Sequence, residues 1–139
     1  MNRKLLILCV VSLSLLNACS SVVFYQVNGL VADEKNQIEI LNLALLEVKK
    51  VFNDIDRFVV IDCNNRKLEK VNEKTKYCKT VNGVKKPYWV NLRVYFEDKS
   101  IVLKYVSNGI NKEKDEKMRN QISEVLSSKK YQVRIISGV

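Results

Sequence analysis

The chain has 139 residues, of which 47% are hydrophobic and 28% are charged. That composition supports one domain with a packed core and argues against a disordered chain. Histidine is absent, which excludes Ser–His and Cys–His catalysis, histidine-ligated zinc and histidine-bound haem. The formal net charge is +9, so an anionic partner has to be considered.

The first residues have the layout of a secretory signal. Arg3 and Lys4 precede an apolar run over residues 5–16, which only two serines interrupt. This run is shorter than the roughly 20 apolar residues that span a bilayer. We therefore expect residues 1–18 to be a signal peptide, with an uncleaved anchor as the alternative.

The end of this segment, Leu16-Asn17-Ala18-Cys19, resembles the bacterial lipobox. The resemblance implies cleavage before Cys19, lipidation of its thiol and a lipidated tether over residues 19–22. Two or more acyl chains, such as palmitate, hold a protein on a membrane stably, whereas one does not. Because no Asp follows Cys19, the sorting rule of Gram-negative lipoproteins implies the outer membrane, with the domain facing the periplasm. An ordinary signal peptide with a chance cysteine is the alternative.

Two further cysteines, Cys63 and Cys78, lie in the remaining chain, fifteen positions apart. An even pair in an exported protein indicates a disulfide. Two free thiols, a redox pair and a metal-binding pair are the alternatives. The lack of both a CxxC spacing and a histidine argues against the last two.

The first half of this chain predicts a strand, a long helix and a second strand. Residues 22–28 are rich in β-branched and aromatic side chains, which favours a strand. Asp33 suits a helix N-cap, and apolar residues recur at helical spacing from Ile38 to Ile55. The continuous apolar run over 58–61 predicts an interior strand that is covered on both faces.

The second half predicts a loop, a hairpin, a helix and a last strand. Residues 63–86 hold eight basic and two acidic side chains, and we expect an exposed loop that the disulfide closes. Residues 88–97 alternate between an apolar and a mixed face, and 101–106 supply the hairpin partner. Asn111 begins a helix, and residues 131–136 form the last strand.

These elements predict an α+β domain over residues 23–139, with a single mixed β-sheet of about five strands and two helices packed on it. The expected order is strand, helix, strand, loop, strand, strand, helix, strand. One layer of helices on one sheet is enough to bury the apolar sides of all these elements.

The stretch Asp56-Arg57-Phe58-Val59-Val60-Ile61-Asp62, which follows the long helix, resembles a known junction. It is similar to the helix–"RF-x-VVD" junction of curli-secretion-type lipoproteins. The same junction occurs in the amino-terminal domain of the Tol translocation β-propeller protein and in lipoprotein activators of penicillin-binding proteins. The resemblance implies an accessory or assembly lipoprotein rather than an enzyme. Homo-oligomers are common among such lipoproteins, so self-association stays open as well.

Two sets of residues are candidates for binding. Trp89, Arg93 and Tyr95 fall on the strand face opposite Val90 and Leu92, where they suit a protein interface if no helix covers them. If a helix covers this face, Trp89 belongs to the core. The second set consists of the basic residues Lys70, Lys74, Lys76, Lys79, Lys85 and Lys86, which could bind an anionic glycan or lipid headgroup. The alternative for this set is a solvated loop.

No catalytic or metal-binding constellation is expected. Asp54, Asp56 and Asp62 straddle a helix end and a strand, and Asp115 and Glu116 suit the start of a helix. A Gly-rich phosphate loop and a Ser-x-x-Lys motif are both lacking in the sequence. We therefore expect a protein without enzymatic activity, cofactor or metal. It would be held at the membrane by lipid and bind another envelope protein, and nucleic acid is a poor candidate partner for an exported chain.

Overall fold

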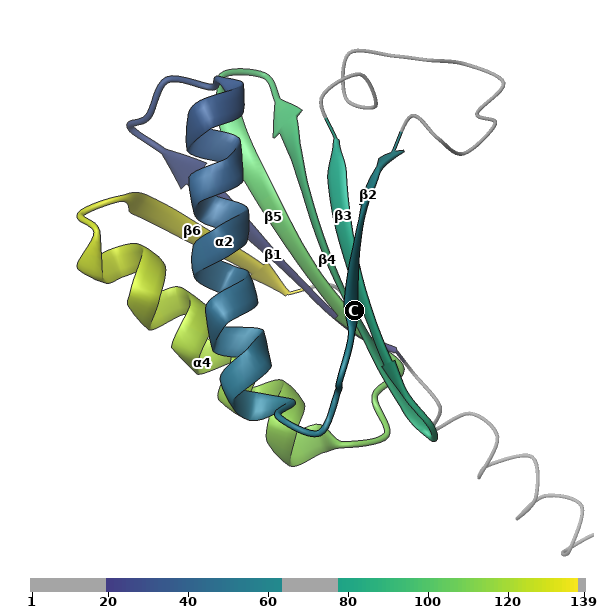
Figure 1. Cartoon of the computed structure of the whole chain (residues 1–139). Coiled ribbons are helices and arrows are strands. Elements are labelled where there is room, and N and C mark those ends of the chain that lie inside the picture. The colour runs from purple at the N-terminus through teal and green to yellow at the C-terminus, as the bar shows by residue number, and fades with distance from the viewer. Residues whose placement is uncertain (1–19, 64–77, 138–139) are drawn as a thin grey trace, which may run out of the picture.

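The computed structural model describes residues 20–63 and 78–137. Within them, six strands form one sheet, and two helices lie together on one of its faces (Figure 1). This arrangement confirms the α+β class. In chain order the elements are β1 (Ser21–Asn28), α2 (Glu34–Val51), β2 (Phe58–Asp62), β3 (Lys79–Lys85), β4 (Tyr88–Glu97), β5 (Ser100–Ser107), α4 (Lys112–Ser128) and β6 (Gln132–Ser137).

The sheet differs from the expected one in direction and in strand number. Its order is β2-β3-β4-β5-β1-β6, and every neighbouring pair is antiparallel, so the sheet is not mixed. The extra strand is β3, which lies inside the stretch 63–86 that we expected to be a loop. Val81 and Gly83 face the helices there, while the lysines at both ends of the strand hide its short alternation. β1 begins at Ser21, so the expected tether over 19–22 overlaps it.

The prediction that residues 58–61 form an interior strand is wrong, because β2 is an edge strand. Val59 and Val60 are 40% and 59% exposed, so neither side of the strand is fully covered. A short apolar run reports hydrophobicity but not position in a sheet. Position here follows from β3, which takes the place between β2 and β4.

Both helices begin where the sequence predicts. The Asp33 side chain accepts a hydrogen bond from the backbone N–H of Asn36 at 2.8 Å, which caps α2. The Asn111 side chain caps α4 in the same way, accepting from the N–H of Lys114 at 3.1 Å. α2 ends at Val51, earlier than the apolar pattern suggested, and Ile55 is buried in the turn that follows.

The core lies between the helices and the face of the sheet that they cover. Alternate residues of β1, β4 and β5 meet the apolar sides of α2 and α4 there. The largest fully buried side chains include Tyr25, Tyr105, Phe52, Ile40 and Leu92. The two buried hydroxyls have partners on α4: Tyr25 donates to the carbonyl of Arg119 at 3.1 Å, and Tyr105 donates to Asp115 Oδ1 at 2.6 Å. Sheet and helix are thus joined by directional bonds as well as by packing.

The expected disulfide is present. Cys63 and Cys78 are bonded, with their Cα atoms 5.1 Å apart, and the N–H of Cys63 donates to the carbonyl of Cys78 at 2.9 Å. The bond therefore joins the end of β2 to the start of β3. It ties the edge strand to its neighbour at the end where the chain leaves the sheet.

Membrane-spanning helices are not found in the part of the chain that the structure describes. Neither α2 nor α4 is long and apolar enough to cross a bilayer.

We expect the Tyr105–Asp115 bond to be measurable as stability and as pH dependence. Replacing Tyr105→Phe removes a bond to a carboxylate oxygen and should cost about 1.5–3 kcal/mol of unfolding free energy. Burial, and then the bond to Asp115, raises the pKa of Tyr105 well above its ordinary value of about 10. Below that pH the neutral phenol is present in both states, so the contribution is complete. As the pH rises above about 10, the unfolded chain loses this proton first and stability falls.

Urea unfolding at a series of pH values measures both effects. The wild-type protein should lose stability above about pH 10 more steeply than Tyr105→Phe does. Equal slopes for the two proteins would contradict the assignment.

Candidate functional site

The two faces of the sheet are unequal, because both helices pack on one of them (Figure 1). We call the other the open face. Alternation and register assign to it the even-numbered residues of β1, β3, β5 and β6 and the odd-numbered residues of β2 and β4. Within the described residues, no helix lies over this face. The fold therefore leaves this face open to solvent or to a partner.

The three residues predicted to bind a partner all lie on the open face. Trp89, Arg93 and Tyr95 alternate along β4 with Val90, Leu92 and Val94, which are buried beneath the helices. Trp89 is 39% exposed, so it does not belong to the core. Arg93 and Tyr95 are half-buried.

An open depression of about 310 Å³ lies in this face, across β3, β4 and β5. Its lining contains Trp89 and Arg93 but not Tyr95. The complete lining consists of Asn82, Trp89, Asn91, Arg93, Lys104 and Val106. The structure therefore brings two of the three predicted residues together around one hollow.

Sequence reasoning missed Asn82, Asn91 and Lys104. The register explains why, since Asn82 lies directly opposite Asn91, and Arg93 lies directly opposite Lys104. The Asn91 side-chain amide donates to the side-chain oxygen of Asn82, which joins β3 to β4 across the floor. These neighbours become visible in the sequence only once the strands are paired, and β3 had not been recognised as a strand.

The depression is electropositive. Like charges directly opposite each other on neighbouring strands are unfavourable, and Arg93 and Lys104 form such a pair. Lys104 lies 5.2 Å above the ring of Phe24, a cation–π contact that partly offsets its charge. Among the residues that the structure describes, the Nε atom of Arg93 is buried and has no hydrogen-bond partner.

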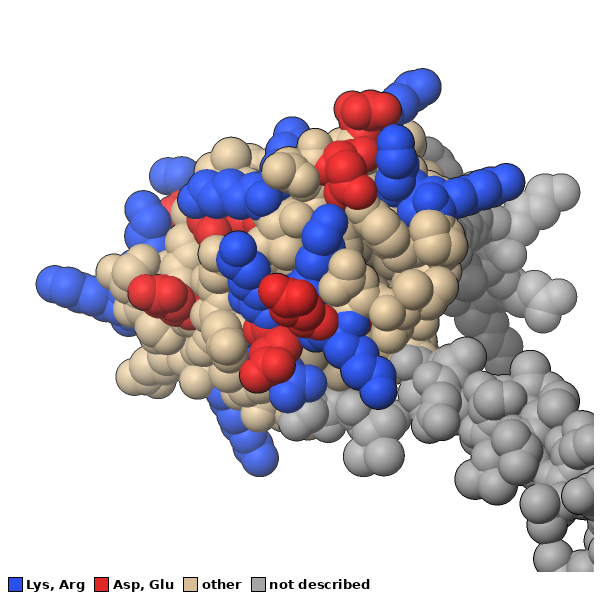
Figure 2. Space-filling view, turned by 90° about the horizontal axis from the view of Figure 1, so that it is seen from below, with Lys and Arg blue, Asp and Glu red and all other residues tan. Residues whose placement is uncertain are grey.

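Of the lysines predicted to bind an anion, the three that the structure describes do not form one cluster. Lys70, Lys74 and Lys76 lie outside the described residues. Lys79 begins β3 and binds Glu34 Oε1 at 3.2 Å, whereas Lys85 and Lys86 are exposed about 20 Å away at the other end of that strand. Figure 2 views the domain from the end with the β3–β4 turn, and there basic and acidic side chains are interspersed.

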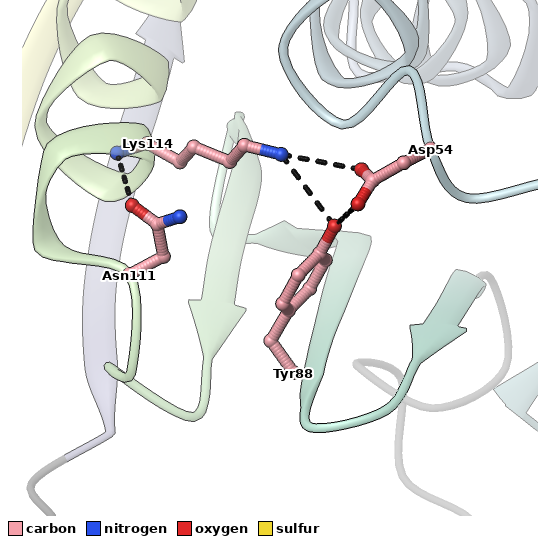
Figure 3. Close-up of polar contacts among 4 residues, drawn as sticks. All are labelled: Asp54, Tyr88, Asn111 and Lys114. Carbon is pink, nitrogen blue, oxygen red and sulfur yellow. Dashed lines mark hydrogen bonds and ion pairs between the residues drawn. The ribbon is translucent and has the colours of Figure 1, made fainter.

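A second polar cluster joins Asp54, Tyr88 and Lys114 (Figure 3). The Tyr88 hydroxyl donates to Asp54 Oδ2, and the Lys114 ammonium group donates to Asp54 Oδ1 at 3.2 Å and to the Tyr88 oxygen at 3.5 Å. Lys114 also lies 5.1 Å above the Tyr88 ring and 5.2 Å above that of Phe52. These contacts join the turn after α2, the start of β4 and the first turn of α4. They hold Tyr88 on the helix side and so fix the neighbouring Trp89 on the open face.

Two of the five acidic residues that we considered for catalysis have structural partners here. Asp54 belongs to the cluster with Tyr88 and Lys114, and Asp115 accepts the bond from Tyr105. Within residues 20–63 and 78–137, no three His, Cys, Asp or Glu side chains come together as metal ligands would. Cys19, the expected lipidation site, precedes the described residues. No protein family matches this chain, and no curated protein matches it either.

Replacing Tyr88→Phe should show whether the cluster positions Trp89. The ring and its packing are kept, and the bond to Asp54 is lost, so we expect about 1 kcal/mol of destabilisation. Trp89 is the only tryptophan, so its fluorescence reports the start of β4 alone. We expect its emission to shift in Tyr88→Phe but not in Lys35→Gln, a change at an exposed site on α2. An unchanged emission spectrum in Tyr88→Phe would exclude the positioning role.

Proposed function

We propose that this protein is a non-catalytic accessory lipoprotein, anchored in the outer membrane, whose periplasmic domain binds another envelope protein through its open face. The signal-like segment and the lipobox resemblance at Leu16-Asn17-Ala18-Cys19 support the location. The resemblance of residues 56–62 to the junction in curli-secretion-type and related lipoproteins supports the accessory role. Lipid would fix the protein at the membrane and raise its effective concentration for partners within reach.

One observation carries the binding role: none of the described elements covers the open face of the sheet, and apolar side chains lie on it. Trp89 and Val84 lie directly opposite each other across β4 and β3, and both are exposed. Val59 and Ile136 are exposed on the outer strands of the same face. Apolar groups that are exposed singly are common on any protein surface, whereas adjacent ones mark interaction sites. The adjacent pair on this face is Trp89 with Val84. Trp89 and Arg93 lie four positions apart on the same face of β4, and tryptophan and arginine are two of the residue types that are enriched in energetic hot spots.

Charge indicates the chemistry of the partner. The charged residues of the open face, among those described, are the basic Arg93, Lys104 and Arg134 and the acidic Glu97. A partner with a complementary, acidic surface would associate faster and more specifically than a basic one. We therefore expect an envelope protein whose contact surface is acidic. A second copy of this chain fits less well, because its own formal charge is strongly positive.

Direct binding of an anionic glycan or lipid headgroup through the lysines is the rival function. The separation of Lys79 from Lys85 and Lys86 weakens it, because these groups cannot act on one small anion. Binding through scattered lysines would weaken steeply with ionic strength, whereas binding centred on Trp89 would change little.

The membrane anchor is tested at Cys19. We expect the wild-type protein to incorporate radioactive palmitate in growing cells and to fractionate with the outer membrane. Cys19→Ala removes the thiol that the lipid would occupy, so it should incorporate none. Palmitate incorporation by Cys19→Ala, or none by the wild type, would contradict the proposed lipidation.

The binding face is tested by crosslinking in intact cells and isolating the tagged protein. Trp89→Ala should lower the yield of a specific acidic partner, with affinity reduced about thirtyfold, the value for a hot spot of about 2 kcal/mol. Leu46→Ala is the matched control, since Leu46 is 57% exposed on α2, away from the open face.

Equal loss in both variants, or in neither, would exclude the open face as the binding surface. Recovery of glycan or lipopolysaccharide alone, lost when Lys85 and Lys86 are both replaced by Gln, would favour the rival function. Recovery of a second copy of this chain, and of no other protein, would refute the acidic partner and indicate self-association.

A further inference from the structure

The depression on the open face holds two cations for which the described residues supply no anion. Arg93 and Lys104 lie directly opposite each other on β4 and β5, and both line the hollow. Within the described part of the chain, no hydrogen bond or ion pair engages either side chain with a carboxylate. The acidic residue of this face, Glu97, lies four positions along β4 from Arg93, which is about 13 Å.

The arrangement is unfavourable without a ligand. Two like charges face each other, and the Nε–H of Arg93 is removed from water with no acceptor among the described residues. Buried N–H groups normally have a hydrogen-bond acceptor, so one without an acceptor requires a physical explanation. An oxyanion in the hollow would supply a counter-charge to both groups and an acceptor to the terminal N–H groups of the Arg93 guanidinium, since Nε itself is closed to solvent.

The surroundings favour a carboxylate over a phosphate. Phosphate sites commonly use backbone N–H groups at helix N-termini or in loops, whereas here the floor is the middle of a sheet whose backbone groups pair with neighbouring strands. Trp89 and Val106 supply apolar walls that suit the methylene groups of an acidic side chain. A volume of about 310 Å³ lies at the lower end of the range for small-ligand pockets and has room for one protruding side chain.

A lipid surface is also a poor match. Membrane-binding patches usually gather four to eight basic residues. The described strands place three basic residues and one acidic residue on this face.

We infer that the hollow between Arg93 and Lys104 is a carboxylate-binding subsite, which receives an Asp or Glu side chain of the acidic protein partner. Arg93 would bind the carboxylate through its planar guanidinium, and Lys104 would supply the second charge. The amides of Asn82 and Asn91 would border the polar side, with Trp89 against the aliphatic part of the incoming side chain. This inference rests on the proposed binding function and names the chemistry that the partner presents.

The direct test uses the full-length protein in detergent and a synthetic probe, acetyl-Gly-Glu-Gly-Glu-Gly-amide. Proton–nitrogen correlation spectra follow the Nε–H signal of Arg93, which is assigned by its loss in Arg93→Lys. We expect the peptide to shift this signal and to change Trp89 fluorescence with the same saturation curve. Arg93→Gln and Lys104→Gln should each weaken binding about tenfold, while Lys35→Gln leaves it unchanged. The matching glutamine peptide should not bind.

The proposed subsite is refuted if the glutamate peptide does not shift the Nε–H signal of Arg93. It is also overturned if inorganic phosphate, or vesicles containing phosphatidylglycerol, shift that signal at lower concentration than the peptide does. Crosslinking in cells separates the two proposals. A partner that is lost in Trp89→Ala but kept in Arg93→Gln would refute the subsite and leave the binding face standing. Loss in both variants supports both proposals, and retention in both refutes the binding face itself.

Discussion

The account depends on one geometric constraint: two helices cover only one face of a six-stranded sheet. Both helices lie over the same face, and their apolar sides pack against alternate residues of β1, β4 and β5. The other face receives no second layer from the described chain. It is therefore either solvated or covered by something other than the described residues. Exposed apolar groups lie on it together with basic groups that no carboxylate of the described residues pairs. This mixture favours a covered face, and the proposed function follows from it.

The anchoring of β4 links the core to that face. Tyr88, held by Asp54 and Lys114 on the helix side, fixes the first residue of the strand, and the alternation of β4 then directs Trp89 and Arg93 outward (Figure 3). Tyr105 and Asp115 act similarly for β5, the strand that carries Lys104. Polar bonds on the covered side thus set the positions of groups on the open side. The residues that we propose for recognition lie on paired strands rather than on loops, which would limit the entropy lost on binding.

The sequence predicts those features that local chemistry determines. The caps Asp33 and Asn111, the alternation of β4 and the pairing of Cys63 with Cys78 are examples. Alternation placed Trp89 opposite Val90 but left open which of the two faces the helices cover. Features that depend on which strands pair could not be predicted. β3 was hidden by lysines at its ends, β2 had the composition of an interior strand, and Lys104 becomes a neighbour of Arg93 only through the register. Location and lipidation rest on residues before Ser20, where resemblance alone supports them.

The central claim, that the open face is covered in the envelope, is tested most directly by cysteine accessibility. Val84 and Val31 are 65% and 71% exposed, and Val84 is the cross-strand neighbour of Trp89, whereas Val31 lies in the connection between β1 and α2. In the purified protein, Val84→Cys and Val31→Cys should react with a small maleimide at similar rates. In intact envelopes, we expect Val84→Cys to be protected and Val31→Cys to react as before. Equal reactivity of the two sites in the envelope would contradict the account.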